Sequence, residues 1–191
     1  MVDATTVRLP AEDPYFVGIN NYAAGATAAQ LMGRFLGGQK GKIIVTSETM
    51  QSRDSIDRRL GFDEVMNREY QDLQTLPSIE THSDLARTRK IFNNIVTNYP
   101  DILGIYVLSS EARIPIEEMS KITTQPLVKI VHERTPFTEA ALQNGQIDAV
   151  IAQNPGHLVR SAIRILKARN DQREPLASQE KIRIEILLKE N

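Results

Sequence analysis

Polar side chains that can bind a ligand through hydrogen bonds follow the predicted strands of this chain. They are amides, hydroxyls, an arginine and a carboxylate, at Asn21, Ser52, Arg53, Ser109, Ser110, Glu133 and Gln153. Each hydroxyl of a sugar or polyol both donates and accepts, so its site needs donors such as Arg facing acceptors such as Glu. A planar guanidinium can also hold two neighbouring oxygens in one fork. The residues therefore predict a binding site for a neutral, polyhydroxylated molecule.

Short β-branched runs alternate with helical patterns, and these elements must position the polar side chains. Strands are predicted over residues 16–19, 42–45, 73–81, 104–108, 126–131, 148–152 and 182–188. Helices are predicted over residues 22–36, 54–69, 116–122 and 156–168, between Ser83 or Asp84 and Pro100, and between Thr135 and Gly145. Strands separated by single helices form right-handed βαβ units. The chain is therefore predicted to be an α/β protein with a mainly parallel sheet in a three-layer α/β/α sandwich, which binds ligands beyond the carboxyl ends of its strands.

Local signals predict the ends and faces of several elements. Asn21 is predicted to cap the first helix. Ile56, Leu60 and Met66 follow a helical spacing and are predicted to face the core. Pro77 interrupts the third predicted strand, which is therefore expected to be short or to lie at an edge.

Composition excludes several classes of function. The 191 residues include 23 Lys and Arg against 24 Asp and Glu, for a formal net charge of -1. A domain that binds nucleic acid through its own surface usually has a basic excess. The chain has no cysteine, which excludes disulfides and thiolate chemistry. No apolar run approaches the roughly 18 residues of a membrane span, so no membrane contact is expected.

The sequence offers little support for catalysis. The glycines within residues 37–41 lie between a helix and a strand, whereas a phosphate-binding loop runs from strand to helix. His82, His132 and His157 have no metal-ligand spacing, and no Gly-x-Ser-x-Gly motif is present. We therefore expect neither metal nor cofactor, and a small hydrolase or transferase is only the third interpretation.

Three stretches resemble a known family. Residues 17–21 lead from a strand into a small-residue helix, residues 58–62 read Arg-Arg-Leu-Gly-Phe, and residues 148–156 read Asp-Ala-Val-Ile-Ala-Gln-Asn-Pro-Gly. In this order they resemble the effector domain of the lac-repressor family, which is similar to the type I periplasmic sugar-binding proteins. The resemblance covers nearly the whole chain and implies a two-lobed fold that binds a sugar between its lobes.

The resemblance also implies site residues. It implies that Arg58 reaches the ligand and that Ser52 and Arg53 lie at the edge of the cleft. Ser109 and Ser110 stand where the family often has Asn-Asp, so the usual carboxylate is missing there.

The resemblance extends to three further positions, and at two of them the residue type differs from the one usual in the family. Glu133 stands where an aspartate is common and would replace it as acceptor, and Asn20 stands where Asp is usual. Gln153 matches the glutamine that the family delivers to its cleft.

Ordinary structural roles remain open for three of these residues. Arg58 could pair with Asp54, one turn away on the same helix. Gln153 could cap the helix that begins at Pro155, and Glu133 could be a surface loop acid.

The resemblance predicts one lobe with half of a cleft. Residues 1–21 would be a remnant of the N-terminal lobe and hinge, 22–152 the C-terminal lobe, and 153–191 hinge crossings with a terminal helix and strand. The first functional prediction is a cytoplasmic, homodimeric transcription regulator whose missing helix-turn-helix binds operator DNA. The alternative is a periplasmic sugar-binding receptor of an ABC transporter. The residues 182–191 resemble the repressor type of terminus and favour the regulator.

Overall fold

A seven-stranded sheet lies at the centre of the computed structural model, which describes residues 17–175 and 182–191. Its strands are β1 (Gly41–Ser47), β2 (Leu73–Thr75), β3 (Ile79–Glu80), β4 (Ile102–Val107), β5 (Val128–His132), β6 (Ala149–Gln153) and β7 (Ile184–Leu187). They lie in the order β2-β1-β4-β5-β6-β7, and β3 also pairs with β1. All pairs are parallel except β6 with β7. The predicted α/β fold with a mainly parallel sheet is confirmed.

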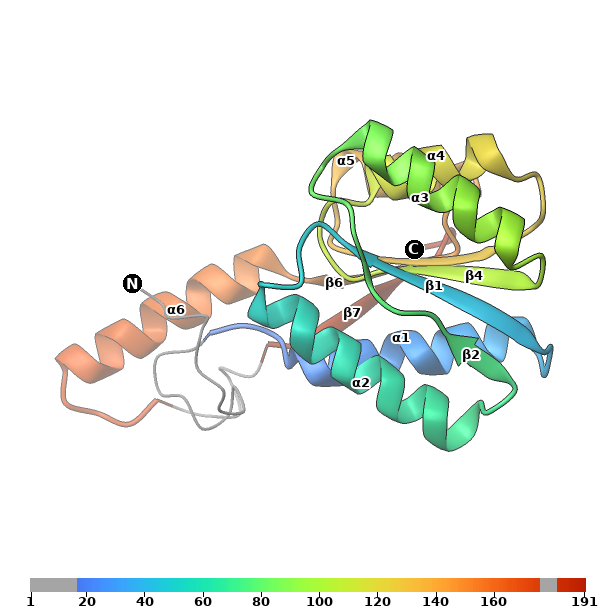
Figure 1. The fold of residues 1–191 in the computed structure, drawn as a ribbon. Coiled ribbons are helices and arrows are strands. Elements are labelled where there is room, and N and C mark those ends of the chain that lie inside the picture. The colour runs from blue at the N-terminus through green and yellow to red at the C-terminus, as the bar shows by residue number, and fades with distance from the viewer. Residues whose placement is uncertain (1–16, 176–181) are drawn as a thin grey trace.

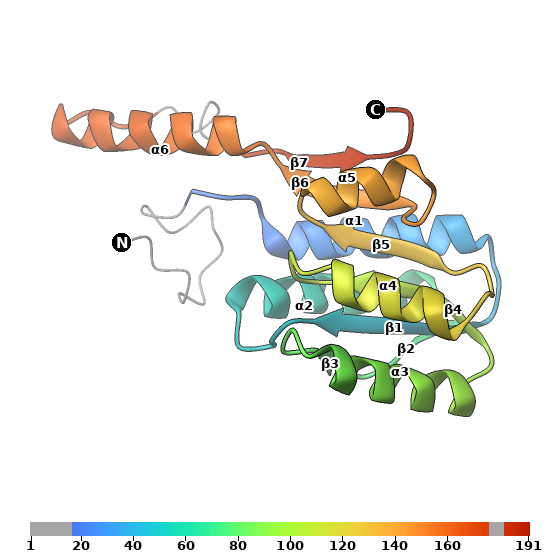
Figure 2. The same ribbon diagram turned by 90° about the horizontal axis from the view of Figure 1, so that it is seen from above.

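Helices cover both faces of the sheet and form the outer layers of the sandwich. They are α1 (Asn21–Leu36), α2 (Arg53–Glu69), α3 (Leu85–Asn98), α4 (Arg113–Ile122), α5 (Pro136–Gln143) and α6 (Pro155–Asn170). Helices α1 and α2 lie on one face, and α3, α4 and α5 lie on the other, each group over its own apolar core (Figure 1). Helix α6 covers neither face, because it projects away from the sheet (Figure 2).

The first predicted strand is wrong. Phe16 lies outside the described residues, and residues 17–20 form no strand. A strand needs a neighbour to receive its backbone hydrogen bonds, and no strand in the described part of the chain pairs with this segment. The β-branched run therefore leads into α1 as an irregular segment of which Ile19 is buried. Residues 1–16, the larger part of the predicted N-terminal remnant 1–21, lie outside the described residues.

Two predictions about the helices on one face are also wrong. Asn20, not Asn21, caps α1, because its Oδ1 accepts the N–H of Ala23 at 2.9 Å. Leu60 is 53% exposed instead of facing the core. Helix α2 turns Arg58 and Gly61 inward, because its close packing against α1 needs a small residue at the crossing. A helical period gives the spacing of a buried face, but it does not say which face that is.

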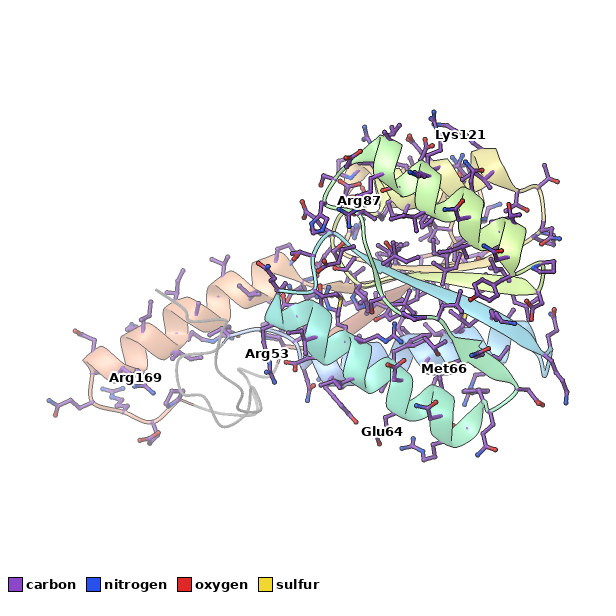
Figure 3. The ribbon with its side chains drawn as sticks, in the orientation of Figure 1. Arg53, Glu64, Met66, Arg87, Lys121 and Arg169 are labelled. Carbon is purple, nitrogen blue, oxygen red and sulfur yellow. The ribbon has the colours of Figure 1, made fainter. Side chains whose placement is uncertain are left out.

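A buried carboxylate joins α3 to α4 on the opposite face. The side chain of Glu118 is fully buried and accepts hydrogen bonds from Arg89 Nε at 2.6 Å and Lys121 Nζ at 2.7 Å. The hydrogen bonds from Arg89 and then Lys121 lower the pKa of Glu118 to about 2. Lys121 lies on the outer surface of α4 (Figure 3), so one buried acid ties together two exposed cations.

Glu118→Gln is expected to lower the free energy of unfolding at pH 7 by about 1.5–3 kcal/mol, the value of a hydrogen bond to a charged group. The folded chain lowers the pKa of Glu118 from 4.5, so the stabilisation is complete above that pH and is lost as the pH falls towards 2. Urea unfolding should therefore show a smaller difference between the two proteins at pH 3 than at pH 7. Glu117→Gln, on the exposed side of the same helix, is the matched control and should change little. An equal loss at both pH values would contradict the assignment.

Candidate ligand-binding site

A hollow of about 320 Å³ opens at the carboxyl ends of β1, β4 and β5. Its walls come from the loop after β1, the first turns of α2, and the residues that follow β4 and β5. The lining residues are Ser47, Glu48, Thr49, Ser52, Asp54, Ser55, Arg58, Ser109, Ser110 and Glu133. This strand-end hollow lies where parallel α/β sheets bind their ligands.

The guanidinium of Arg58 is fixed on several sides. The residue is 3% exposed. Its Nε donates to Asn21 Oδ1 at 2.9 Å, its Nη1 to the carbonyl of Leu108 at 2.7 Å, and its Nη2 to Glu133 Oε1 at 3.1 Å. Asp54 in turn accepts from Asn21 Nδ2 at 3.0 Å. Of the five N–H groups of a guanidinium, three donate in these hydrogen bonds and two have no acceptor among the described residues.

Glu133 reaches Arg58 because the chain turns sharply after β5. Its φ of 67° lies in the left-handed region, which is uncommon for a residue other than glycine. The N–H of Glu133 donates to the carbonyl of Ile151 on β6 at 2.9 Å, which holds this turn against the sheet. The side chain is 24% exposed, so the carboxylate contacts Arg58 and is also open to the hollow. The pair can offer donors and an acceptor side by side.

A buried tyrosine and histidine form the wall behind this ion pair. The hydroxyl of Tyr106 and Nε2 of His132 share a hydrogen bond at 2.7 Å, and Phe62 stacks on Tyr106 with 4.5 Å between ring centroids. Burial, and then the charge of Arg58, lower the pKa of His132 well below its usual range. His132 is therefore neutral near pH 7, and Arg58 does not face a second cation there.

Hydroxyl groups form the other side of the hollow. Ser47 Oγ donates to the carbonyl of Thr49 at 2.9 Å and lies 2.9 Å from Ser55 Oγ, which must then be the donor of that pair. Ser109 Oγ accepts the N–H of Glu48 at 3.0 Å and keeps its own O–H to donate. Such hydroxyls can turn to donate or accept, as sugar hydroxyls do.

Five residues predicted from the sequence lie together in the lining, namely Ser52, Arg58, Ser109, Ser110 and Glu133. Ser52 makes no side-chain capping bond to α2, although it is the N-cap residue. Asn21 lies behind Arg58 and holds it. The structure gives Arg58 the partner Glu133 and gives Asp54 the partner Asn21, so the pairing of Arg58 with Asp54 does not occur.

Two predicted residues lie outside the lining. Arg53 begins α2 (Figure 3), where its Nη2 pairs with Asp57 Oδ1 at 2.8 Å. The Oε1 atom of Gln153 is buried and has no hydrogen-bond partner among the described residues. Asn154, not Gln153, caps α6, because its Oδ1 accepts the N–H of His157 at 2.9 Å.

Five lining residues are not among the predicted site residues, namely Ser47, Glu48, Thr49, Asp54 and Ser55. Their signal is position alone, since all of them lie between the end of β1 and the first turn of α2. Serines and acids are common in such loops, so their residue types do not distinguish them from ordinary loop residues.

The arrangement is suited to binding by hydrogen bonds. Within residues 17–175 and 182–191, no group of three or more His, Asp or Glu side chains is arranged to hold a metal ion. In the same part of the chain, no helix combines the length and the apolar character that crossing a membrane requires.

Comparison with known protein families identifies the family of this chain. Residues 2–173 match the model of the periplasmic binding protein domain. No curated protein sequence matches the chain significantly.

Solved structures share the fold at low sequence identity. AraP, an arabinose binding protein from Geobacillus stearothermophilus, is 20% identical with a TM-score of 0.76, and the alignment covers 92% of this chain and 63% of that protein. GanP, a glucose-galactose binding protein from the same organism, is 18% identical with a TM-score of 0.77, over 98% of this chain and 65% of that protein. A sugar-binding protein of a sugar ABC transporter from Bacillus halodurans is 20% identical with a TM-score of 0.76, over 92% of this chain and 64% of that protein.

The chain thus spans less than two thirds of the length of these proteins, and its sheet and helices correspond to one lobe of the fold. The family match, by contrast, extends over most of the chain. The chain belongs to the family of the periplasmic binding protein domain.

Proposed function

We propose that this chain is the larger part of a sugar-binding receptor that serves an ABC transporter. The observation that carries the proposal is the Arg58–Glu133 pair, which is held at 3.1 Å in a hollow lined with hydroxyls and carboxylates. The likeness to AraP and GanP supports it, because their names describe sugar binding. A receptor of this kind would act outside the cytoplasmic membrane.

The chemistry of the hollow explains why a sugar or polyol would fit. The two remaining N–H groups of Arg58 could donate to neighbouring hydroxyl oxygens, while Glu133 and Asp54 could accept hydroxyl protons. A ligand with many hydroxyls satisfies both kinds of group at once, whereas a molecule that only accepts would leave the carboxylates unpaired. The favoured ligand is therefore a neutral monosaccharide or polyol.

Glu133→Gln is expected to weaken sugar binding about tenfold or more, because a neutral amide replaces a charged acceptor worth at least ~1.4 kcal/mol. The measurement is isothermal titration of the complete gene product with D-arabinose, D-allose, D-galactose, D-glucose and sorbitol. Glu139→Gln is the matched control, since Glu139 on α5 is about half exposed, pairs with Arg134 and does not line the hollow. If none of these compounds binds, or if both variants bind as the wild type does, the proposal fails.

A second candidate is the effector domain of a transcription regulator. The terminal residues 182–191, which resemble the repressor type of terminus, favour it. In that case operator DNA would be bound by a helix-turn-helix outside this chain, in a cytoplasmic homodimer, and sugar binding would shift a hinge equilibrium. The gene sequence upstream of the codon for Met1 distinguishes the two: a helix-turn-helix there would favour the regulator, and a signal peptide would favour the receptor.

A further inference from the structure

The chain makes a tight turn between β3 and α3, beside the loop that follows β1 (Figure 2). His82 and Ser83 have φ angles of 49° and 54°, so two consecutive residues other than glycine lie in the left-handed region. We call them the 82–83 turn. A residue with a Cβ adopts this conformation at a cost in free energy and keeps it only where its surroundings hold it there.

Backbone hydrogen bonds to the end of β1 hold the 82–83 turn in place. The N–H of Thr81 donates to the carbonyl of Ser47 at 2.9 Å, and the N–H of His82 donates to the carbonyl of Glu48 at 3.0 Å. Asp84 then caps α3 with its side chain. The turn is therefore fixed by β1 on one side and by the start of α3 on the other.

The same turn holds the side chain of Glu48. Ser83 Oγ donates to Glu48 Oε1 at 2.8 Å, while the backbone N–H of Glu48 donates to Ser109 Oγ at 3.0 Å. The other carboxylate oxygen of Glu48 has no donor among the described residues. Glu48 lines the strand-end hollow, whereas His82 and Ser83 do not. A serine outside the lining thus orients a carboxylate inside it.

Strand β3, just before the turn, holds the next part of the same loop. Glu80 Oε1 accepts the N–H of Met50 at 2.5 Å, and Glu80 Oε2 lies 3.4 Å from His82 Nε2. Residues 47–50 are therefore tied to β3 and to the 82–83 turn along their whole length.

The order of Glu48 matters for binding. An acceptor that moves freely must lose conformational entropy when a ligand binds, whereas an acceptor that is already held loses less. Glycine would adopt both left-handed conformations without strain. The serine at position 83 therefore contributes what glycine cannot, which is a hydroxyl group that donates to Glu48.

We propose that Ser83 is a positioning residue for the strand-end hollow, where it orients the Glu48 carboxylate to accept a hydrogen bond from a sugar hydroxyl. The proposal rests on the proposed function, because it needs a ligand with hydroxyl groups in the hollow. It adds Glu48 to the ligand contacts and adds the 82–83 turn, which lies outside the lining, to the structure that determines affinity.

Isothermal titration of the complete gene product tests the proposal, with whichever of D-arabinose, D-allose, D-galactose, D-glucose and sorbitol binds the wild type most tightly. Ser83→Gly should weaken binding about threefold, as expected for the loss of one exposed hydrogen bond. The thermal unfolding midpoint should not fall, because glycine relieves the backbone strain. His82→Gly is the matched control, since it relieves the same kind of strain but leaves the Ser83 hydroxyl in place. It should bind the sugar as the wild type does.

Two further comparisons show whether Ser83 acts through Glu48. Ser83→Asn should restore most of the affinity, because asparagine tolerates the left-handed region and its amide can donate to the carboxylate. Glu48→Ala should weaken binding, and adding Ser83→Gly to Glu48→Ala should cause almost no further loss, because the carboxylate that the serine orients is already gone.

Several results would overturn the proposal. Wild-type affinity in Ser83→Gly is one of them. Equal losses in Ser83→Gly and His82→Gly would assign the effect to the flexibility of the turn, and full additivity of Ser83→Gly with Glu48→Ala would show that the serine acts without Glu48. If the wild type binds the sugar and only these comparisons fail, the proposed function stands without the positioning role. If the wild type binds none of the five compounds, the proposed function itself fails and the positioning role fails with it.

Discussion

Arg58→Ala is expected to lower the free energy of unfolding by about 3–5 kcal/mol, because removing one partner of a buried ion pair leaves the other groups without compensation. The variant would strand the side-chain oxygens of Asn21 and Glu133 and the carbonyl of Leu108, all of which now accept hydrogen bonds from the guanidinium. It would also open a cavity between α1, α2 and the sheet. Urea unfolding of the 191-residue chain at pH 7 measures the loss.

A second variant at this position separates the geometry of Arg58 from its charge. Arg58→Lys keeps the positive charge but cannot direct donors to three separate acceptors, so it should recover less than half of the loss. Arg53→Ala, one turn earlier on α2, is the control, because its partner Asp57 and its own side chain are both partly exposed. That control should cost less than about 1 kcal/mol. Similar losses for Arg53→Ala and Arg58→Ala would show that the contacts of Arg58 stabilise the chain no more than those of a partly exposed arginine.

Gly61→Ala is expected to destabilise the chain by about 3 kcal/mol, at the upper end of what overpacking costs. A Cβ at Gly61 would lie 2.0 Å from the carbonyl oxygen of Tyr22, and one at Gly25 would lie 1.9 Å from that of Arg58. These atoms belong to backbone, so α1 and α2 must move apart. Alanine favours a helix over glycine by about 1 kcal/mol. Without the contact between α1 and α2, Gly61→Ala would therefore be expected to stabilise the chain.

Gly156→Ala on α6 provides the matched control for Gly61→Ala. Its new Cβ would meet the end of the Arg160 side chain at 3.1 Å, and that side chain can move. The change in unfolding free energy should stay within about 1 kcal/mol. Separation of α1 from α2 would also displace Arg58 from Asn21, so Gly61→Ala should weaken sugar binding in the complete gene product, whereas Gly156→Ala should not. Stability equal to that of the wild type in Gly61→Ala would disprove the close crossing.

Under the proposed function, the same residues would determine both stability and ligand binding. Arg58 contacts α1 through Asn21, the end of β4 through Leu108 and the end of β5 through Glu133. A side chain that joins three elements at the carboxyl edge of the sheet is already ordered before a ligand binds. Less conformational entropy is then lost on binding, which favours affinity.

Much of the fold could be predicted from local patterns. The runs at β1, β4, β5 and β6 are continuous and β-branched, as buried parallel strands are, and single helices separate them. Thr135 and Pro136 mark the start of α5, and the structure has a capping box there. The fold class follows because the connection rules allow few arrangements of such units.

Other local features depended on neighbours that a pattern does not contain. Residues 17–20 have β-branched character but no strand beside them in the described part of the chain. Leu60 has the spacing of a buried residue, yet the contact of Gly61 with α1 turns it outward. Gln153 and Arg53 stand where the family resemblance places ligand contacts, but neither lines the strand-end hollow.

The sequence by itself determined the order of strands and helices, the parallel sheet and the edge at which a site should lie, because these depend on periodicity and connection rules. It also supplied Arg58 and Glu133 as candidates. Only the tertiary structure decided that these two residues meet, since they are 75 positions apart and reach each other through a left-handed turn and a close helix crossing. Such contacts arise when separate elements pack, and packing depends on side-chain volumes on both partners at once.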